Sequence, residues 1–138
     1  MVNFKSSIPA LPVVSIKKAV DFYQIKMGFQ TRHQEDTFAV MVRGGVEIHL
    51  WQACDQSWKF RSLLLFLRLI RSGAETFIAG TASCRIKVEG IEELYQEYKD
   101  QGVLHGEHNT IEEQYWGDRD LSTLDLYGNL LTFYEEIG

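Results

Sequence analysis

One pattern occurs twice in this sequence: a short apolar strand, then an amphipathic helix, then a glycine. The first copy is LPVVSIKKAVDFYQIKMGF at residues 11–29. The second, at an offset of about 75 residues, is CRIKVEGIEELYQEYKDQGV at residues 84–103. Self-similarity on this scale indicates a duplicated module, although two strand–helix units can also resemble each other by chance.

Both copies carry apolar residues at the three-and-four spacing of one helical face. The residues at this spacing are Ile16, Ala19, Val20 and Tyr23 in the first helix and Ile91, Leu94, Tyr95 and Tyr98 in the second. Ser15 is placed to cap the first helix at its N-terminus. Gly28 and Gly102 are predicted to end the two helices as C-caps.

Strands follow each helix, so each half is predicted as strand, helix and three strands. The predicted strands of the first half are 29–35, 38–43 and 46–51. In the second half a polar stretch follows the helix, and the strands 120–126 and 130–135 are then joined by a turn at 127–129. Residues 52–80 belong to neither half and are a connector. Its stretch SLLLFLRLIRSG fits a short helix or a buried loop, and the pattern does not decide between them.

The stretch VEIHLW, residues 46–51, alternates in the manner of a half-buried strand. One face is aliphatic and carries Val46, Ile48 and Leu50. The other face carries Glu47, His49 and Trp51. The aliphatic face suits the helix side of an antiparallel sheet, so the second set is expected on a free face that lines a cavity.

Composition and charge are those of a soluble globular protein, with 45% hydrophobic and 24% charged residues and a net charge of −5. The negative charge argues against a general nucleic-acid binder and permits a cationic partner, although on its own it indicates only solubility. Cys54 and Cys84 fit reduced thiols. The N-terminus lacks a signal-peptide pattern, and LLLFLRLI is too short to span a bilayer, so a cytoplasmic protein without membrane or nucleic-acid partners is predicted.

The stretch EEQYWGDRD, residues 112–120, places two large rings among carboxylates. Tyr115 and Trp116 stand between Glu112 and Glu113 on one side and Asp118 and Asp120 on the other. A core strand would not carry so many acids, and a solvated loop would not normally carry so large an apolar surface. The pattern indicates an aromatic surface beside negative charge, although the acids alone fit a solvated face.

Two modules of this kind in 138 residues resemble the vicinal oxygen chelate superfamily, also called the glyoxalase/bleomycin-resistance fold. Residues 11–29 resemble its opening strand and helix, and EDTFAVMVRGGVEIHLW resembles the next strands of its bleomycin-resistance branch. EEQYWGDRDLSTLDLYGNLLTFYE, residues 112–135, is similar to that branch's Q-x-W-G…D-x-x-G-N-x-x-x-F ending. The D-x-x-G-N turn is common to the superfamily, whereas its combination with Q-x-W-G is much more specific.

The resemblance implies a single α+β domain over residues 1–138, built of two βαβββ modules that form a cupped antiparallel or mixed sheet with the helices outside. The modules span about 7–51 and about 81–136, with the connector at about 52–80. It also implies a homodimer whose grooves are built from both chains. The N-terminal segment is expected to be exchanged between subunits, with Pro9 as hinge and Pro9 and Pro12 at a sheet edge.

Metal-binding members of the superfamily take ligands from four inward positions. These correspond here to Ile8, Glu47 or His49, Ser83 and Thr132. Isoleucine offers no lone pair, and serine and threonine are poor ligands for a divalent ion. A protein without metal or other cofactor is therefore predicted. The stretch HGEH at 105–108 fits a solvated loop better than a metal site.

The branch sequesters bleomycin-type drugs, which are cationic and carry a flat bithiazole, without chemical change. The resemblance implies that the planar group stacks between Phe38 and the partner subunit's Trp116, with carboxylates holding the cation. The predicted ligand-binding residues are Phe38, Glu47, His49, Trp51, Trp58, Phe60, Glu112, Glu113, Tyr115, Trp116 and Asp118. No residue is predicted to be catalytic.

Alternative roles are open for several of these residues. Phe38 without the resemblance is core filler, and Trp51 fits a cavity wall as well as packing. Trp58 and Phe60 fit either a lid or a cap on the core. Tyr115 stands where the branch often has proline, which leaves the identity of the ligand open. The competing functional hypothesis, a metal-dependent lyase or dioxygenase of the glyoxalase type, requires the four ligand positions described above.

Overall fold

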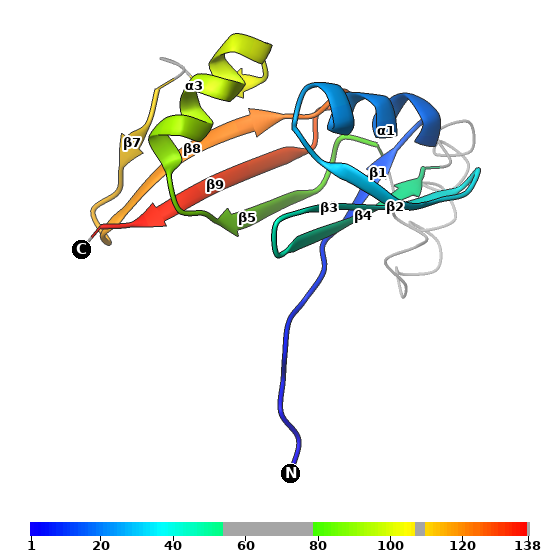
Figure 1. The fold of residues 1–138 in the computed structure, drawn as a ribbon, viewed down its shortest axis with the longest axis horizontal. Coiled ribbons are helices and arrows are strands. Elements are labelled where there is room, and N and C mark those ends of the chain that lie inside the picture. Colours follow the sequence, from blue (N-terminus) through cyan, green and yellow to red (C-terminus); the bar gives the residue numbers. More distant parts are fainter. Residues whose placement is uncertain (54–78, 107–109, 138) are drawn as a thin grey trace, which may run out of the picture.

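A computed structural model of the chain describes residues 1–53, 79–106 and 110–137 (Figure 1). The first module consists of β1 (Ala10–Val13), α1 (Ile16–Ile25), β2 (Gln30–Gln34), β3 (Phe38–Arg43) and β4 (Val46–Gln52). Its sheet has the order β1-β4-β3-β2, in which β1 is parallel to β4 and the other pairs are antiparallel. β1 is therefore an edge strand, as the two prolines predicted.

The second module repeats this arrangement. It consists of β5 (Ser83–Lys87), α3 (Ile91–Gln101), β6 (Leu104–His105), β7 (Glu112–Glu113), β8 (Asp118–Leu124) and β9 (Leu130–Glu136). The sheet order is β5-β9-β8-β6, with β5 parallel to β9 and with β7 also paired to β8. The α+β duplication is confirmed. The polar stretch after α3, for which no strand bounds were predicted, forms two very short strands, and His105 lies in β6 rather than in a loop.

The helix α1 begins as predicted. The Ser15 hydroxyl accepts a hydrogen bond from the Lys18 N–H (3.2 Å), and all four predicted face residues are buried. The predicted end of α1 is wrong, because Lys26 is the C-cap. Gly28 has a positive φ of 77°, and a Cβ there would lie 2.5 Å from Nη1 of Arg43. Gly28 thus lies in the left-handed region just beyond the helix end, which favours glycine, and a side chain there would also displace the Arg43 guanidinium. In α3, Gly102 is the C-cap, as predicted.

Arg43 helps to join the two modules. Its guanidinium makes a bidentate ion pair with Glu97 of α3 (2.7 and 2.9 Å) and donates to the Met27 carbonyl (2.7 Å). The Tyr98 hydroxyl donates to the same carbonyl (2.8 Å). Burial raises the pKa of Tyr98, so the hydroxyl remains a donor at neutral pH. The end of α1 is therefore held against α3 by polar contacts as well as by the shared apolar core.

A buried polar cluster joins β1 to the turn between β8 and β9. Asn129 is fully buried; its Nδ2 donates to the Pro12 carbonyl and to Asp125 Oδ2, both at 2.9 Å. Its Oδ1 accepts from the Ala82 N–H (3.2 Å). The Tyr23 hydroxyl donates to Asp125 Oδ2 (2.8 Å), and burial raises the pKa of Tyr23 well above its ordinary value. The D-x-x-G-N turn therefore ties the C-terminal module to the N-terminal strand.

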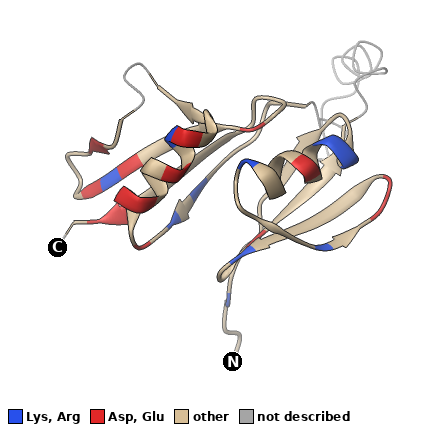
Figure 2. Cartoon of the chain, turned by 45° about the horizontal axis from the view of Figure 1, so that its top comes forward, with Lys and Arg blue, Asp and Glu red and all other residues tan. Residues whose placement is uncertain are grey.

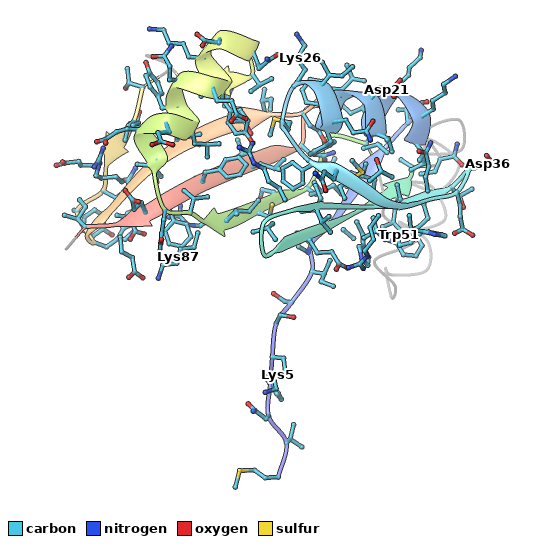
Figure 3. The ribbon with its side chains drawn as sticks, in the orientation of Figure 1. Lys5, Asp21, Lys26, Asp36, Trp51 and Lys87 are labelled. Carbon is cyan, nitrogen blue, oxygen red and sulfur yellow. The ribbon has the colours of Figure 1, made fainter. Side chains whose placement is uncertain are left out.

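The helices lie on one side of the two sheets, and none of the described helices covers the opposite side, called the free side below (Figure 1). Trp51 and Lys87 project on that free side (Figure 3). Residues 1–9 extend away from the body of the molecule on the same side (Figure 1). In the part of the chain that the structure describes, no helix is long and apolar enough to cross a membrane.

Candidate functional site

The free face of the first sheet carries an aromatic cluster. Phe38 on β3 is directly opposite Trp51 on β4, and their ring centroids are 5.0 Å apart. The His49 ring meets Phe38 edge-on, also at 5.0 Å. Phe38 is half-buried and Trp51 is 42% exposed. Phe38 therefore belongs to a partly open aromatic surface and not to the buried core.

Glu47 and His49 lie side by side on this face, as the alternation of VEIHLW predicted. His49 Nε2 is 2.7 Å from Glu47 Oε2, and Arg32 Nη1 is 2.7 Å from Glu47 Oε1. The hydrogen bond with His49 and the neighbouring Arg32 guanidinium hold the pKa of the Glu47 carboxyl below its ordinary value. The carboxylate is thus charged at neutral pH. Both oxygens already have partners in the chain.

Tyr115 and Trp116 form the tip of a hairpin between β7 and β8. The Gln114 N–H donates to the Asp118 carbonyl (2.7 Å), and the Gly117 N–H donates to the Gln114 carbonyl (3.1 Å). Gly117 has a φ of 99°, which a residue with a side chain rarely adopts. The backbone of the turn therefore explains why glycine follows Trp116. The two rings meet edge-to-face at 4.8 Å. Tyr115 is 96% exposed and Trp116 is 53% exposed.

The acids around this tip fall into two groups. Glu112 and Glu113 are exposed on β7. Asp118 and Asp120 are on β8, with side chains only 15% and 10% exposed. These two carboxylates meet Arg85 of β5, at 3.2 Å from Asp118 Oδ2 and 3.6 Å from Asp120 Oδ2. The solvated-face interpretation therefore fits the two glutamates and fails for the two aspartates.

Arg85 is a residue of this site that the sequence did not predict. It lies on β5 and comes close to Asp118 and Asp120 of β8 because β5 and β8 both pair with β9. Its guanidinium stands over the Tyr134 ring, 4.7 Å from the centroid. Asp118 Oδ2 also accepts a hydrogen bond from the Trp116 indole N–H (2.8 Å). Nothing local in CRIKVEG marks this arginine as a site residue, since its partners are 33 or more positions away.

Negative charge is concentrated in the second module. Residues 81–138 hold 13 acidic and 4 basic residues, whereas residues 1–53 hold 4 acidic and 6 basic residues. Figure 2 shows acidic residues gathered on α3 and around β7 and β8. Arg119 of β8 is paired with Glu92 of α3. A cation approaching the protein is therefore attracted to the end of the molecule that carries Trp116.

A cleft of about 500 Å³ lies between the two modules. It is lined by Ser7, Ile8, Pro9, Gly45, Val46, Glu47, Cys84, Arg85, Ile86 and Lys87. It thus connects the start of β1 and the Glu47 end of β4 with Arg85 of β5. Burial raises the pKa of the Cys84 thiol to about 11, so this free thiol is not a reactive thiolate at neutral pH.

The four positions implied as metal ligands do not form a metal centre. Ile8 precedes β1, Ser83 begins β5, and Thr132 Oγ1 is 3.1 Å from the Ser122 hydroxyl. Across residues 1–53, 79–106 and 110–137, no group of three or more His, Cys, Asp and Glu side chains is placed to hold a metal ion. The residues present do not fit such an ion.

The structure brings the predicted binding residues together as two separate surfaces. Phe38, Glu47, His49 and Trp51 lie on the first sheet, and the residues from Glu112 to Asp118 lie on the second. Phe38 and Trp116 are thus on different sheets of one chain. Trp58 and Phe60 lie outside the described residues.

The fold has many solved relatives. A bleomycin-binding protein from Streptomyces verticillus, solved with copper(II)-bleomycin, matches with a TM-score of 0.70 at 20% identity and covers 100% of this chain and 99% of that one. A bleomycin resistance determinant encoded on transposon Tn5 matches with a TM-score of 0.69 at 18% identity, covering 96% and 98%. A glyoxalase/bleomycin resistance protein/dioxygenase from Nocardioides matches with a TM-score of 0.64 at 17% identity, covering 99% and 87%. These likenesses define a protein of the glyoxalase/bleomycin-resistance fold.

Sequence relatives narrow this class. No family model matches the chain. Bleomycin resistance proteins of Geobacillus stearothermophilus and of Staphylococcus aureus strain MRSA252 are each 50% identical to it over 131 residues, which are 95% of this chain and 96% of each relative. The chain therefore belongs to the bleomycin resistance protein family, as its Q-x-W-G and D-x-x-G-N motifs predicted.

Proposed function

We propose that this protein binds bleomycin or a similar cationic, planar compound and confers resistance by stoichiometric sequestration without chemical change. The observation that carries the proposal is Trp116, a half-exposed ring at a hairpin tip, held beside Asp118 in the acidic module. A planar heterocycle gains stacking energy on such a ring, and a cation gains attraction from the surrounding charge. The 50% identical resistance proteins support the same ligand class.

The binding test is a calorimetric titration with metal-free bleomycin. One drug is expected to bind per site, and the drug recovered after denaturing the protein is expected to have an unchanged mass. Failure to bind would contradict the proposal that bleomycin is the ligand. A changed mass of the recovered drug would show that the protein modifies the drug chemically, against the proposed sequestration.

The proposed binding groove is shared by two chains. Phe38 of one chain and the partner subunit's Trp116 are its stacking walls, as the resemblance to the bleomycin-resistance branch implies; within a single chain the two residues lie on different sheets. Glu47, His49 and Trp51 support the Phe38 wall, and Tyr115 extends the Trp116 wall. Glu112 and Glu113, which are exposed, attract the cation to the groove.

The N-terminal segment supports a dimer. Val2 and Phe4 are 82% and 92% exposed, although both are apolar, and Figure 1 shows residues 1–9 extending from the body. Such a segment gains stability by packing on a second copy, and Pro9 is its hinge. The cleft between the two modules lies at the base of this segment and is the receiving surface in the exchange that we propose.

Sedimentation at micromolar concentration is expected to show a dimer. A variant without residues 2–8 is expected to dimerise more weakly, because it lacks the apolar side chains that pack on the partner. The matched control is the full-length chain with Lys5→Ala, which leaves the apolar residues of the segment in place. A monomeric full-length protein would contradict the two-chain groove.

The purified protein is expected to hold no stoichiometric transition metal. Ile8, Ser83 and Thr132 offer no strong ligand, and the Glu47 carboxylate is already paired with both His49 and Arg32. Elemental analysis measures this directly. About one zinc, nickel or manganese per chain would contradict the proposal in favour of a glyoxalase-type lyase or dioxygenase.

A further inference from the structure

We propose that Asp118 is a positioning residue for Trp116 and not a direct contact for the cation of the ligand. The inference rests on the proposed function, because it assigns a role within the same groove. Asp118 would act by accepting the indole N–H, while Arg85 holds the carboxylate in place. Arg85 thereby becomes part of the binding machinery, although it does not touch the ligand.

The geometry of Asp118 supports this role. Its Oδ2 is 2.8 Å from the Trp116 Nε1 and 3.2 Å from Nη2 of Arg85, so one oxygen serves both partners. Only 15% of the side chain is exposed. A carboxylate that is shielded and paired with a guanidinium attracts a further cation less than a free carboxylate does. Glu112 and Glu113 are exposed and are the better attractors.

Arg85 is itself held from several sides. Its Nη1 faces Asp120 Oδ2 at 3.6 Å, and its guanidinium stands over Tyr134. Asp120 Oδ1 accepts from Gln114 Nε2 (3.2 Å), and Gln114 belongs to the same hairpin turn as Trp116. The turn is therefore tied to the sheet through two side chains, Gln114 and Trp116. Both ties meet at Arg85.

Orientation of Trp116 matters because the ring is at an exposed turn. The ring is 53% exposed and has one ring neighbour at the tip, Tyr115. Ordering a free side chain on binding costs conformational entropy, whereas a ring held in advance avoids that cost. The hydrogen bond to Asp118 holds the indole before the ligand arrives. Its loss should weaken binding without removing any atom that touches the ligand.

Two substitutions separate positioning from charge. Asp118→Asn removes the charge but keeps an oxygen that accepts the indole N–H, whereas Asp118→Ala removes both. We expect Asp118→Ala to weaken bleomycin binding roughly tenfold and Asp118→Asn to weaken it by less than about threefold. Equal losses in the two variants would overturn the proposal, because the charge would then be the part that matters.

A double-mutant cycle tests whether Asp118 acts through the indole N–H. Trp116→Phe keeps an aromatic ring and removes the donor, so it should weaken binding by itself. In the Trp116→Phe background, Asp118→Ala is expected to change the affinity for bleomycin by less than about twofold, because Asp118 no longer has an indole N–H to hold. A change of that size is within the usual error of a double-mutant cycle. A full tenfold loss in the Trp116→Phe background would show that Asp118 acts independently of the indole, against the proposal.

The indole N–H gives a readout that needs no ligand. Its proton resonance in the free protein, assigned by its loss in Trp116→Phe, should move to the position of a solvent-exposed indole in Asp118→Ala and remain near its original position in Asp118→Asn. An unmoved resonance in Asp118→Ala would contradict the positioning role. If the wild-type protein does not bind bleomycin, the proposed function fails, and this spectrum still decides whether Asp118 holds Trp116.

Discussion

Asn129→Ala is expected to lower the free energy of unfolding by about 3 kcal/mol, because it removes three hydrogen bonds from a buried polar cluster. The Asn129 side chain is fully buried and makes three hydrogen bonds, with the Pro12 carbonyl, the Ala82 N–H and Asp125 Oδ2. In Asn129→Ala the Ala82 N–H loses its hydrogen bond to the Asn129 side chain, and the Pro12 carbonyl keeps only the longer hydrogen bond from the Gly80 N–H (3.4 Å). The melting temperature should fall by roughly 10 °C.

Tyr23→Phe is the matched control for this prediction. It removes a single hydrogen bond to Asp125 from the same cluster and keeps the buried ring. The expected loss is about 1 kcal/mol. Urea unfolding of both variants, at one fixed protein concentration because association adds to stability, measures the difference. A loss in Asn129→Ala no larger than that in Tyr23→Phe would mean that Asn129 does not hold β1 to the C-terminal turn.

Trp116→Ala is expected to weaken ligand binding by at least ~2 kcal/mol, which is roughly thirtyfold in dissociation constant. The physical reason is the loss of a large stacking surface at the centre of the proposed groove. The protein should remain folded, because Trp116 lies at an exposed hairpin tip outside the apolar core. Calorimetric titration measures the affinity, and circular dichroism with sedimentation measures fold and assembly. Unfolding of this variant would place Trp116 in the core and the groove elsewhere.

Changing both Glu112 and Glu113 to glutamine provides the contrasting variant. These exposed carboxylates are expected to act at long range, so the variant should bind more slowly and with a weaker dependence on salt. Its dissociation rate should change little. Stopped-flow association at several salt concentrations measures this. An unchanged association rate and salt response would make the two glutamates ordinary solvated residues.

Much of the fold could be predicted from the sequence because the controlling interactions are local. The apolar spacing of Ile16, Ala19, Val20 and Tyr23 predicts one buried helical face, and all four are buried. The alternation in residues 46–51 predicts the two faces of β4, and Ile48 and Leu50 are fully buried. Helix and strand periods are properties of neighbouring residues, so they can be read without knowing the rest of the chain.

The end of α1 was harder to predict for a physical reason. Glycine after a helix usually indicates a C-cap, which is correct at Gly102. Gly28 lies two residues beyond the C-cap Lys26, has a positive φ, and stands against the Arg43 guanidinium of β3, which occupies the space of a side chain. The sequence around Gly28 contains no sign of that arginine.

The candidate site divides in the same way. The sequence by itself determined that an aromatic pair stands among acids at 112–120 and that Glu47, His49 and Trp51 share a strand face. Only the tertiary structure decided that Asp118 is shielded and paired while Glu112 is exposed, and that Arg85 completes the cluster. The reason is that β5 and β8 meet only through their common neighbour β9. A contact between residues 85 and 118 depends on strand pairing across the whole module, and local residue patterns carry no record of it.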